Sequence, residues 1–309
     1  MTVYFLFLFY LKKMRIFGYR QLVRVCDNPV KLLKFLLDNG LIKRHARCPG
    51  HNCRKMMVLI RDRTKRDGYK FRCSKCRTTQ SIRKGSFFAN SRLSIDDILC
   101  LTFCWACKLS VKSTAIMACV CPSSVCQWFQ FIREKCSEAL INDQDYTFGG
   151  PGVVVQIDES VVARCKYHVG RAVNQQWVFG LYDTSTKREH IQLVDDRRAE
   201  TLIPIIQKYI KPGSTIFSDQ WAAYRDLQRL GYQHHTVNHS QNFVDPTTGT
   251  CTNAIEAYWS HVKRNIRLRW LSRRDQLPLR IDEFLWRDSL NSQLYRDVFH
   301  EIIGLLAIN

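Results

Sequence analysis

Residues 153–160 read VVVQIDES, and this stretch decides how the second half of the chain is expected to fold. Its valines and isoleucine predict a buried β-strand that ends in Asp158. A carboxylate at the end of a buried strand lies at the edge of a sheet, close to the ends of neighbouring parallel strands. Glu159 is expected on the opposite side from Asp158, because side chains alternate along a strand. We therefore expect Glu159 to hold a neighbouring basic group or to lie in a second layer around the site.

Two further acids follow in a regular order. Strand-like runs occupy 176–182, 189–195 and 214–218, and the last of these continues into Asp219. A helix expected at 253–268 carries Glu256 in its first turns. Parallel strands would bring Asp158 and Asp219 to one sheet edge, and the helix would bring Glu256 over it. Three strands, a helix at 197–210, a fourth strand and a last helix follow the order of a ribonuclease-H-like α/β fold.

Three converging carboxylates need a cation if they are to remain ionised. Carboxylate oxygens favour Mg²⁺ or Mn²⁺, and two such ions about 4 Å apart would support phosphodiester chemistry. Each acid also has a structural reading: Asp158 as a strand-end cap, Asp219 as a turn former and Glu256 as a first-turn helix acid. Asp195 and Asp196 are rival carboxylates, for which capping the 197–210 helix is the expected role.

A cysteine pattern in the first half predicts a metal site. CPGHNC and CSKC place two close pairs nineteen residues apart, formed by Cys48, Cys53, Cys73 and Cys76. Two such turns suit one tetrahedral Zn²⁺, which would stabilise a module too small to fold on its own core. The alternative is two unrelated reduced pairs. Most of the other cysteines of the fourteen lie in apolar helical stretches and favour a reducing compartment.

Charge is concentrated rather than spread. The net charge is +20, of which +14 lies between Lys43 and Arg92 and +6 between His261 and Arg280. Such clustering predicts a polyanionic partner, most simply nucleic acid, rather than a merely solvated surface. The candidate phosphate contacts are Arg61, Arg63, Lys65 and Arg66 in the first zone and Lys263, Arg264 and Arg267 in the second.

The pattern divides the chain into four expected domains. These are an N-terminal helical segment (1–46), a zinc ribbon (47–92), a helical region resembling a helix-turn-helix (93–148) and the ribonuclease-H-like catalytic domain (149–309). Within the third, one long helix is expected to precede two shorter ones. Ser123 or Ser124 would cap the last of them, and 123–137 is the candidate recognition helix. A plain helical bundle is the alternative, because 93–148 has a net charge of −2.

Several ordered motifs carry a specific resemblance. QIDES, SDQW, HHTVNHSQNFVDPTTGTCTNAIEAYWSHVKR, LRIDEFLWR and CSKCRTTQSIRKGSFFANSRL resemble the transposases of Merlin DNA transposons and of bacterial insertion sequences with an N-terminal zinc ribbon. The resemblance runs from about residue 45 to 290. It implies that Asp158, Asp219 and Glu256 are the acids of a DDE transposase. One departure is Cys251, where many relatives carry histidine.

The resemblance also implies an activity. Such an enzyme binds terminal inverted repeats, frees a 3′-OH by metal-dependent hydrolysis and joins that hydroxyl to target DNA, usually as a homo-oligomer. Two alternatives remain: a domesticated or decayed copy that only binds DNA through zinc, and a structure-selective nuclease. In a eukaryotic host the protein would act in the nucleus, and otherwise in the cytoplasm or nucleoid. The apolar run 3–11 is too short to span a membrane, and residues 1–13 are expected to precede a true start at Met14.

Overall fold

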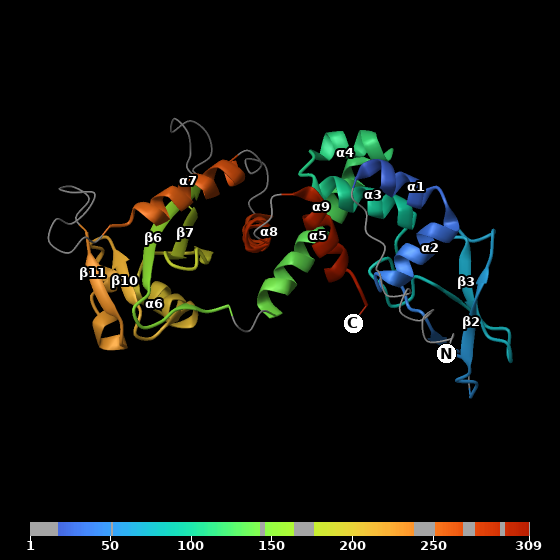
Figure 1. Cartoon of the computed structure of the whole chain (residues 1–309), viewed down its shortest axis with the longest axis horizontal. Coiled ribbons are helices and arrows are strands. Elements are labelled where there is room, and N and C mark those ends of the chain that lie inside the picture. The colour runs from blue at the N-terminus through green and yellow to red at the C-terminus, as the bar shows by residue number, and fades with distance from the viewer. Residues whose placement is uncertain are drawn as a thin grey trace, which may run out of the picture. The chain divides into compact units, whose positions relative to one another are not determined.

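The computed structural model describes residues 18–50, 52–142, 146–163, 176–237, 251–267, 276–290 and 294–308. Residues 1–13 lie outside this range. The chain forms two compact units (Figure 1). The first takes in the residues up to Cys136 and the segment from Ser292 onward, and the second is Ser137–Asn291. The boundary therefore falls inside one helix rather than at the Gly/Pro-rich stretch near residue 149. The four predicted domain boundaries stay predictions.

The first unit begins with two short helices, α1 (Tyr19–Cys26) and α2 (Pro29–Asp38). The Asn28 side chain caps α2 by accepting hydrogen bonds from the backbone N–H groups of Val30 and Lys31. The helix ends at Asn39, and Gly40 follows with φ of 69°, a backbone conformation that glycine adopts without strain. The helical spacing of the apolar residues in VKLLKFLLDNG and its Asn39-Gly40 pair predict this helix and its end, and both are confirmed.

A small antiparallel sheet follows, with strand order β1-β2-β3-β4. Its strands are β1 (Ala46–Arg47), β2 (Met56–Arg61), β3 (Tyr69–Arg72) and β4 (Thr79–Ser81). Phe71 and Met57 are buried, whereas Met56 and Val58 on β2 are about half exposed. This core is small, which agrees with the expectation that the module needs a further source of stability.

Three helices follow the small sheet: α3 (Ile95–Ala106), α4 (Val111–Ala118) and α5 (Pro122–Asn142). The first unit includes α5 only as far as Cys136. The expected order of one long and two shorter helices is wrong, because α5 is the longest. The expected caps at Ser123 and Ser124 are also wrong. Pro122 occupies the first helical position, where its missing N–H is not needed and its fixed φ suits a helix, so α5 starts earlier.

The C-terminal helix α9 (Tyr295–Leu305) also belongs to the first unit. Phe299 is fully buried and packs edge-on against Phe103 of α3, with ring centroids 5.3 Å apart. The segment thus differs from its expected place in a domain spanning 149–309. Its buried apolar face explains the difference, because the helix buries that face against α3.

The second unit is built on a five-stranded sheet of order β11-β10-β6-β7-β8. β7 runs antiparallel to its neighbours β6 and β8, whereas β10 and β11 run parallel to β6. The bounds are β6 (Val154–Ala163), β7 (Gln176–Asp183), β8 (Glu189–Val194), β10 (Thr215–Ser218) and β11 (Gln233–Thr236). Outside this sheet, β5 (Phe148–Gly149) and β9 (Ile210–Lys211) form a separate two-stranded parallel pair. This strand order is the ribonuclease-H-like arrangement.

Helices cover both faces of this sheet, as Figure 1 shows for α6 and α7. On one face α6 (Ala199–Tyr209) packs through Leu202 and Ile206 against Ile157 and Phe179. On the other, α7 (Asn253–Arg267) and α8 (Leu277–Ser289) bury apolar residues against Val178 and Ile191. Successive side chains of a strand point to opposite faces of the sheet, so β7 contributes residues to both hydrophobic cores.

Two expectations about this unit are corrected. The strand that was expected to end at Asp158 continues to Ala163, because β7 goes on pairing with β6 after β10 has ended. The sequence WAAYRDLQRLG at 221–231 predicts a short helix, but it forms two 3₁₀ turns, Ala222–Tyr224 and Leu227–Leu230. Asp158 consequently lies inside β6, at the level where the sheet narrows.

Among the described residues, no single helix is long and apolar enough to cross a membrane. α4 and α5 pass that test of length and composition only when counted together, and they are bent by 111° at the break between them.

Candidate active site

Asp158 and Asp219 come together because two parallel strands hold them at the same level. Val155 of β6 pairs with Ile216 of β10, and Gln156 pairs with Phe217. Asp158 comes two residues after Gln156, and Asp219 comes two residues after Phe217, so the same register places the two acids side by side. Carboxylate oxygens of Asp158, Glu159 and Asp219 lie within 4.8 Å of one another. The sequence-based pairing of the first two acids agrees with this geometry.

The Asp158 carboxylate faces α7. Its Oδ2 atom accepts a hydrogen bond of 2.9 Å from the indole Nε1 of Trp259, which is itself buried in the core beneath α7. Burial raises the pKa of Asp158 to about 6, the Trp259 bond opposes that rise, and the nearby charges of Asp219 and Glu256 add to it. Trp259 is therefore a core residue that also orients the Asp158 carboxylate.

Glu159 lies on the opposite face of β6, as alternation predicts. Its carboxylate accepts a hydrogen bond from the Tyr224 hydroxyl and lies 3.8 Å from a guanidinium nitrogen of Arg197. Burial raises the pKa of Glu159 to about 7, and Asp158 and Asp219 reinforce the rise. The expectation that it holds a basic group is confirmed. Because it stands at the narrowed end of the sheet, its carboxylate nevertheless reaches the other two acids.

Glu256 is placed less closely. It lies exposed in the first turn of α7, one turn before Trp259, and its Oε1 accepts a hydrogen bond of 3.0 Å from the Thr252 hydroxyl. Its negative charge contributes to the raised pKa of Asp158. In the described part of the chain, however, the close carboxylate group contains Glu159 and not Glu256. Whether Glu256 is the third ligand stays a prediction.

Gly180 leaves the room that Trp259 needs. A Cβ atom at this position of β7 would lie 2.6 Å from Cζ2 of the Trp259 ring. We expect Gly180→Ala to displace the indole, to weaken its bond to Asp158 and to lower the free energy of unfolding by about 1–3 kcal/mol. Urea unfolding measures this. Gly304→Ala in α9 is the matched control, since open space surrounds it and alanine favours helix. Equal effects of both changes would refute the argument.

The buried acids predict a pH effect in protein studied without Mg²⁺ or Mn²⁺. Because the folded-state pKa of Glu159 is raised to about 7 from 4.5, its stabilising contribution is fully present below about pH 4.5 and is lost as pH rises through 7. Glu159→Gln should therefore flatten the fall in stability between pH 5 and 8, by up to about 3 kcal/mol. Unfolding midpoints of both proteins at each pH test this. An unchanged slope would contradict it.

Sequence reasoning missed the aromatic residues around Arg197. The guanidinium carbon of Arg197 lies 4.2 Å from the ring centroid of Trp177 and 4.4 Å from that of Trp221. Trp221 also ties two loops together: its backbone N–H donates to Oδ1 of Asp219, and its indole N–H donates to the carbonyl of Arg197. No local motif announces this contact, because its members come from three separate segments.

The rival carboxylates lie outside the close group. Asp196 accepts hydrogen bonds from the Arg198 backbone and the Thr201 hydroxyl at the start of α6, and Asp195 is exposed. Cys251 lies near β6, with its Sγ 4.0 Å from the side-chain nitrogen of Gln156.

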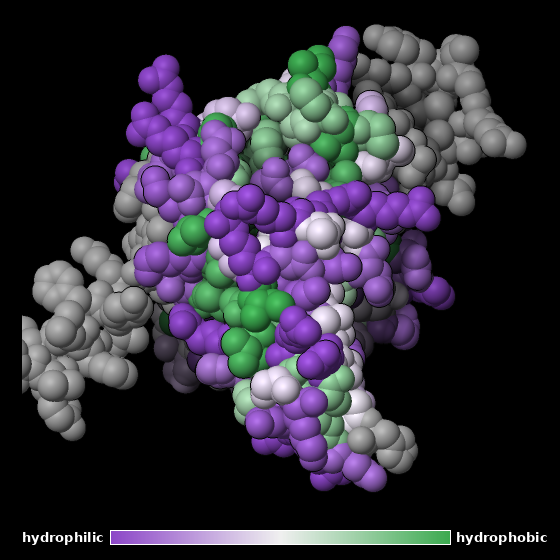
Figure 2. Space-filling view, turned by 90° about the vertical axis from the view of Figure 1, so that its right-hand side faces the viewer, coloured by the Kyte–Doolittle hydropathy of each residue, from purple (hydrophilic) through white to green (hydrophobic). Residues whose placement is uncertain are grey.

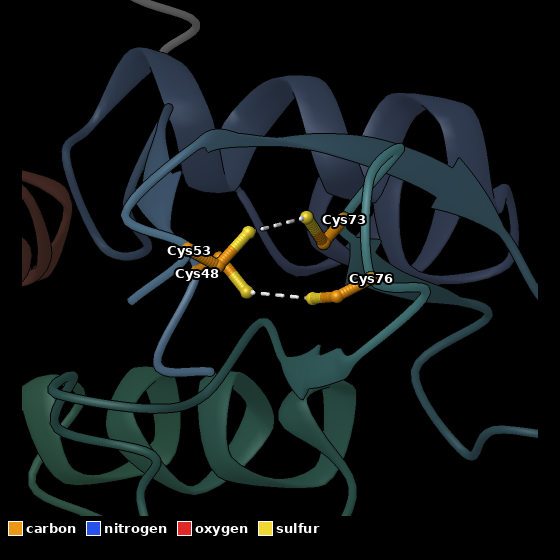
Figure 3. Close-up of side chains that lie close together, drawn as sticks. All are labelled: Cys48, Cys53, Cys73 and Cys76. Carbon is orange, nitrogen blue, oxygen red and sulfur yellow. Dashed lines mark hydrogen bonds between the residues drawn. The ribbon is translucent and has the colours of Figure 1, made fainter. Parts of the chain in front are cut away.

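The four predicted cysteine ligands meet in the first unit (Figure 3). Sγ of Cys48 is 3.3 Å from that of Cys76, and Sγ of Cys53 is 3.6 Å from that of Cys73, so each contact joins one close pair to the other. Such separations exceed a disulfide bond and approach the ~3.8 Å that tetrahedral Zn–S bonds of about 2.3 Å imply. The donor set therefore fits one zinc ion.

The surroundings of the thiols also suit a metal. The Gly50 backbone N–H donates to Sγ of Cys48. The Thr78 side chain and backbone lower the pKa of Cys76 to about 6, which favours the thiolate. A Cβ at Gly50 would lie 3.4 Å from Sγ of both Cys48 and Cys76, so glycine lets the backbone approach the sulfurs closely.

The predicted basic contacts are accessible where the structure describes them. Arg61, Arg63, Lys65 and Arg66 are exposed at the end of β2 and in the turn that follows. The face of the molecule shown in Figure 2 is largely hydrophilic, with hydrophobic patches between. On α7, Arg264 is exposed and Lys263 is half-buried, whereas the side chain of Arg267 lies outside the description.

A ribonuclease-H-like sheet with acids gathered at neighbouring strands defines a class that includes nucleic-acid-cutting and -joining enzymes. Residues 150–288 match the family model of the ISXO2-like transposase domain. The predicted kinship with transposases is thus confirmed at that level, while the closer relation to Merlin elements stays a prediction.

The chain is also similar to individual proteins. An uncharacterized transposase-like protein of Haemophilus influenzae is 28% identical over 95 residues, which cover 31% of this chain and 76% of that protein. The catalytic core domain of BIV integrase is 14% identical, covering 45% of this chain and 83% of its own, with a TM-score of 0.31. A Mos1 transposase paired-end complex is 13% identical, with coverages of 64% and 78% and a TM-score of 0.24. Since both TM-scores are low, the fold assignment rests on the strand order.

Proposed function

We propose that the protein binds the terminal inverted repeats of its own element, cuts DNA at those ends and joins them to target DNA. The observation that supports this most strongly is the meeting of Asp158 and Asp219 on adjacent parallel strands, inside a matched transposase domain. Two acids from distant segments are held at one level by the backbone, so their separation depends little on side-chain freedom.

Asp158 and Asp219, with Glu256 from α7, would hold two Mg²⁺ or Mn²⁺ ions. When bound, such ions polarise a phosphoryl oxygen and make water a better nucleophile. The protein's own contribution is orientation. Trp259 engages one oxygen of Asp158 and leaves the other available, and the Trp221 backbone N–H fixes Asp219 in the same way. Hydrolysis breaks the bond between phosphorus and the 3′ oxygen, and the released 3′-OH then displaces a 3′ oxygen of target DNA. No covalent bond to the protein is required.

DNA binding would fall to the basic surfaces. The hairpin residues Arg61, Arg63, Lys65 and Arg66 would contact phosphates from a ribbon held by Zn²⁺, and the α4–α5 pair would act as a helix-turn-helix. Lys263, Arg264 and Arg267 follow Glu256 along α7 and would contact phosphate near the cut. Joining two ends requires at least two protomers on DNA. The basic run 263–274 would also serve nuclear entry in a eukaryotic host; otherwise the protein would act in the cytoplasm or nucleoid.

A copy that only binds DNA is the second candidate function, and one observation favours it. Cys251 lies next to Gln156 of β6, and the resemblance to Merlin-type transposases implies a histidine at the position of Cys251. A thiol in place of an imidazole removes a group able to contact DNA or a metal ligand near the site. Cleavage rather than binding therefore separates the two candidates.

The test uses the purified full chain and a labelled duplex carrying the inverted repeat that flanks its gene. With Mg²⁺ or Mn²⁺ we expect strand cleavage that leaves a 3′-OH, followed by joined product when target DNA is added. EDTA should abolish both. Tight binding without cleavage in either metal would reject the enzyme and favour the DNA-binding copy.

A further inference from the structure

Arg197 contacts two tryptophan rings in addition to the Glu159 carboxylate, although neutralising that carboxylate would not require the rings. Its guanidinium group lies between the rings of Trp177 and Trp221, at 4.2 and 4.4 Å from their centroids. Contact with both rings restricts the orientation of the guanidinium group and leaves its N–H groups available for hydrogen bonding. A lysine would neutralise Glu159 without two tryptophans, so the arrangement selects the direction of a planar fork.

The hydrogen-bond donors of this fork are unused within the part of the chain that is described. The nearest acid is Glu159, and the separation of 3.8 Å between its Oε2 and a guanidinium nitrogen is an ion pair. A direct charge-assisted bond would be about 2.8 Å. No side-chain hydrogen bond joins Arg197 to a described residue, although about a third of the side chain is exposed. An oriented arginine with free donors is a site for a planar or tetrahedral oxyanion.

The position of the fork relates it to the carboxylates. Glu159, its ion-pair partner, has a carboxylate oxygen within 4.8 Å of oxygens of Asp158 and Asp219. Trp221 forms a second link, since it donates to Asp219 and to the Arg197 carbonyl. Only the Glu159 side chain separates the Arg197 guanidinium group from Asp158 and Asp219. A DNA strand that places a phosphate between these two acids therefore passes close to the guanidinium group.

We infer that Arg197 binds a phosphate of the DNA strand that is cut, at or next to the scissile position. Trp177 and Trp221 are positioning residues that aim its guanidinium group. This inference rests on the proposed function, because it names how the same site holds its substrate. The nearby Arg198 has a different environment: it is largely exposed and bonded to Asp196 through Nε and a terminal nitrogen.

The test is a binding cycle in which single phosphates of the inverted-repeat duplex are replaced by neutral methylphosphonates. Unchanged protein should lose about tenfold in affinity when the contacted phosphate is neutralised. The double variant Arg197→Gln/Glu159→Gln, which leaves no unpaired buried charge, should lose about twofold or less at that position. Arg198→Gln is the matched control and should keep the tenfold loss. Affinity is measured without added Mg²⁺ or Mn²⁺ and with the structural zinc retained, so cleavage is not needed.

A second variant guards against misfolding. Arg197→Lys keeps the charge beside Glu159 but not the planar fork, and it should retain normal unfolding while lowering the cleavage rate at saturating DNA about tenfold or more. Equal sensitivity of unchanged and double-variant protein at every phosphate would overturn the inference. If unchanged protein cleaves DNA without any such coupling, only the inference fails. If coupling is present but no cleavage occurs, only the proposed enzyme activity fails.

Discussion

Asp158→Asn is expected to lower the rate of DNA strand cleavage about a thousandfold or more while leaving DNA affinity within a few-fold. The asparagine keeps the size of the side chain and can still accept the Trp259 hydrogen bond. It removes the negative charge that would bind a divalent ion beside Asp219. The expected loss corresponds to about 4 kcal/mol of transition-state stabilisation. Single-turnover cleavage of a labelled end, with affinity measured on the same duplex, provides the check.

The control for this variant is Asp195→Asn. Asp195 follows the third strand of the same sheet and is exposed, but it is absent from the close carboxylate group among described residues. It should cleave at close to the normal rate. If Asp158→Asn cleaves as fast as Asp195→Asn, the acids of β6 and β10 do not form the cutting site.

A comparison of Glu256→Gln with Glu159→Gln identifies the third acid. The proposed assignment predicts a thousandfold loss for Glu256→Gln and a smaller one for Glu159→Gln, because Glu159 is already engaged by Tyr224 and Arg197. The reverse order would move the third ligand to Glu159, as the close grouping of its carboxylate with Asp158 and Asp219 allows.

Cys73→Ser is expected to abolish binding of about one zinc ion per chain and to unfold the ribbon around β2 and β3. Cys73 is fully buried, and its Sγ lies 3.6 Å from that of Cys53. Structural zinc contributes about 10–16 kcal/mol in small zinc modules, far more than is expected from a small core built around residues such as Phe71, Ile82 and Phe88. DNA affinity should fall by at least about a hundredfold at moderate salt, because the exposed arginines of the hairpin lose their fixed positions.

Zinc content by mass spectrometry and DNA affinity across a salt series test this expectation. Cys126→Ser is the control, since Cys126 is exposed on α5 and outside the described four-thiol group. It should retain zinc and normal affinity. One zinc ion per chain in Cys73→Ser would exclude a site that needs all four thiols.

Sequence reasoning predicted the parts of the fold that local pattern controls. Apolar runs marked four strands of the catalytic sheet, and Asp158 and Asp219 followed from where those runs met polar residues. The end of β6 was misplaced, because its length is decided by pairing with β7 rather than by its own composition. Period-two alternation placed Glu159 on the correct face, but it could not show that the sheet narrows there.

The remaining differences come from contacts between distant segments. Nothing near Arg197 in the chain predicts two tryptophans from β7 and from the loop after β10. No helix was predicted at 295–305, and the partner of α9, α3, lies far away in the sequence. A tryptophan directly after an acid at a strand end, as in SDQW, is a signal that could have drawn attention to Trp221.

The parallel pairing of β6 with β10 has a consequence for how the protein is made. Val154 pairs with Thr215, 61 residues later, and β7, β8 and α6 are synthesised between them. Contacts over such separations form slowly, because closing the loop costs chain entropy before any pairing repays it. A nascent chain thus displays Asp158 on a hairpin without Asp219 beside it. The pair of acids in the proposed cutting site should therefore be complete only after the ribosome has passed Asp219.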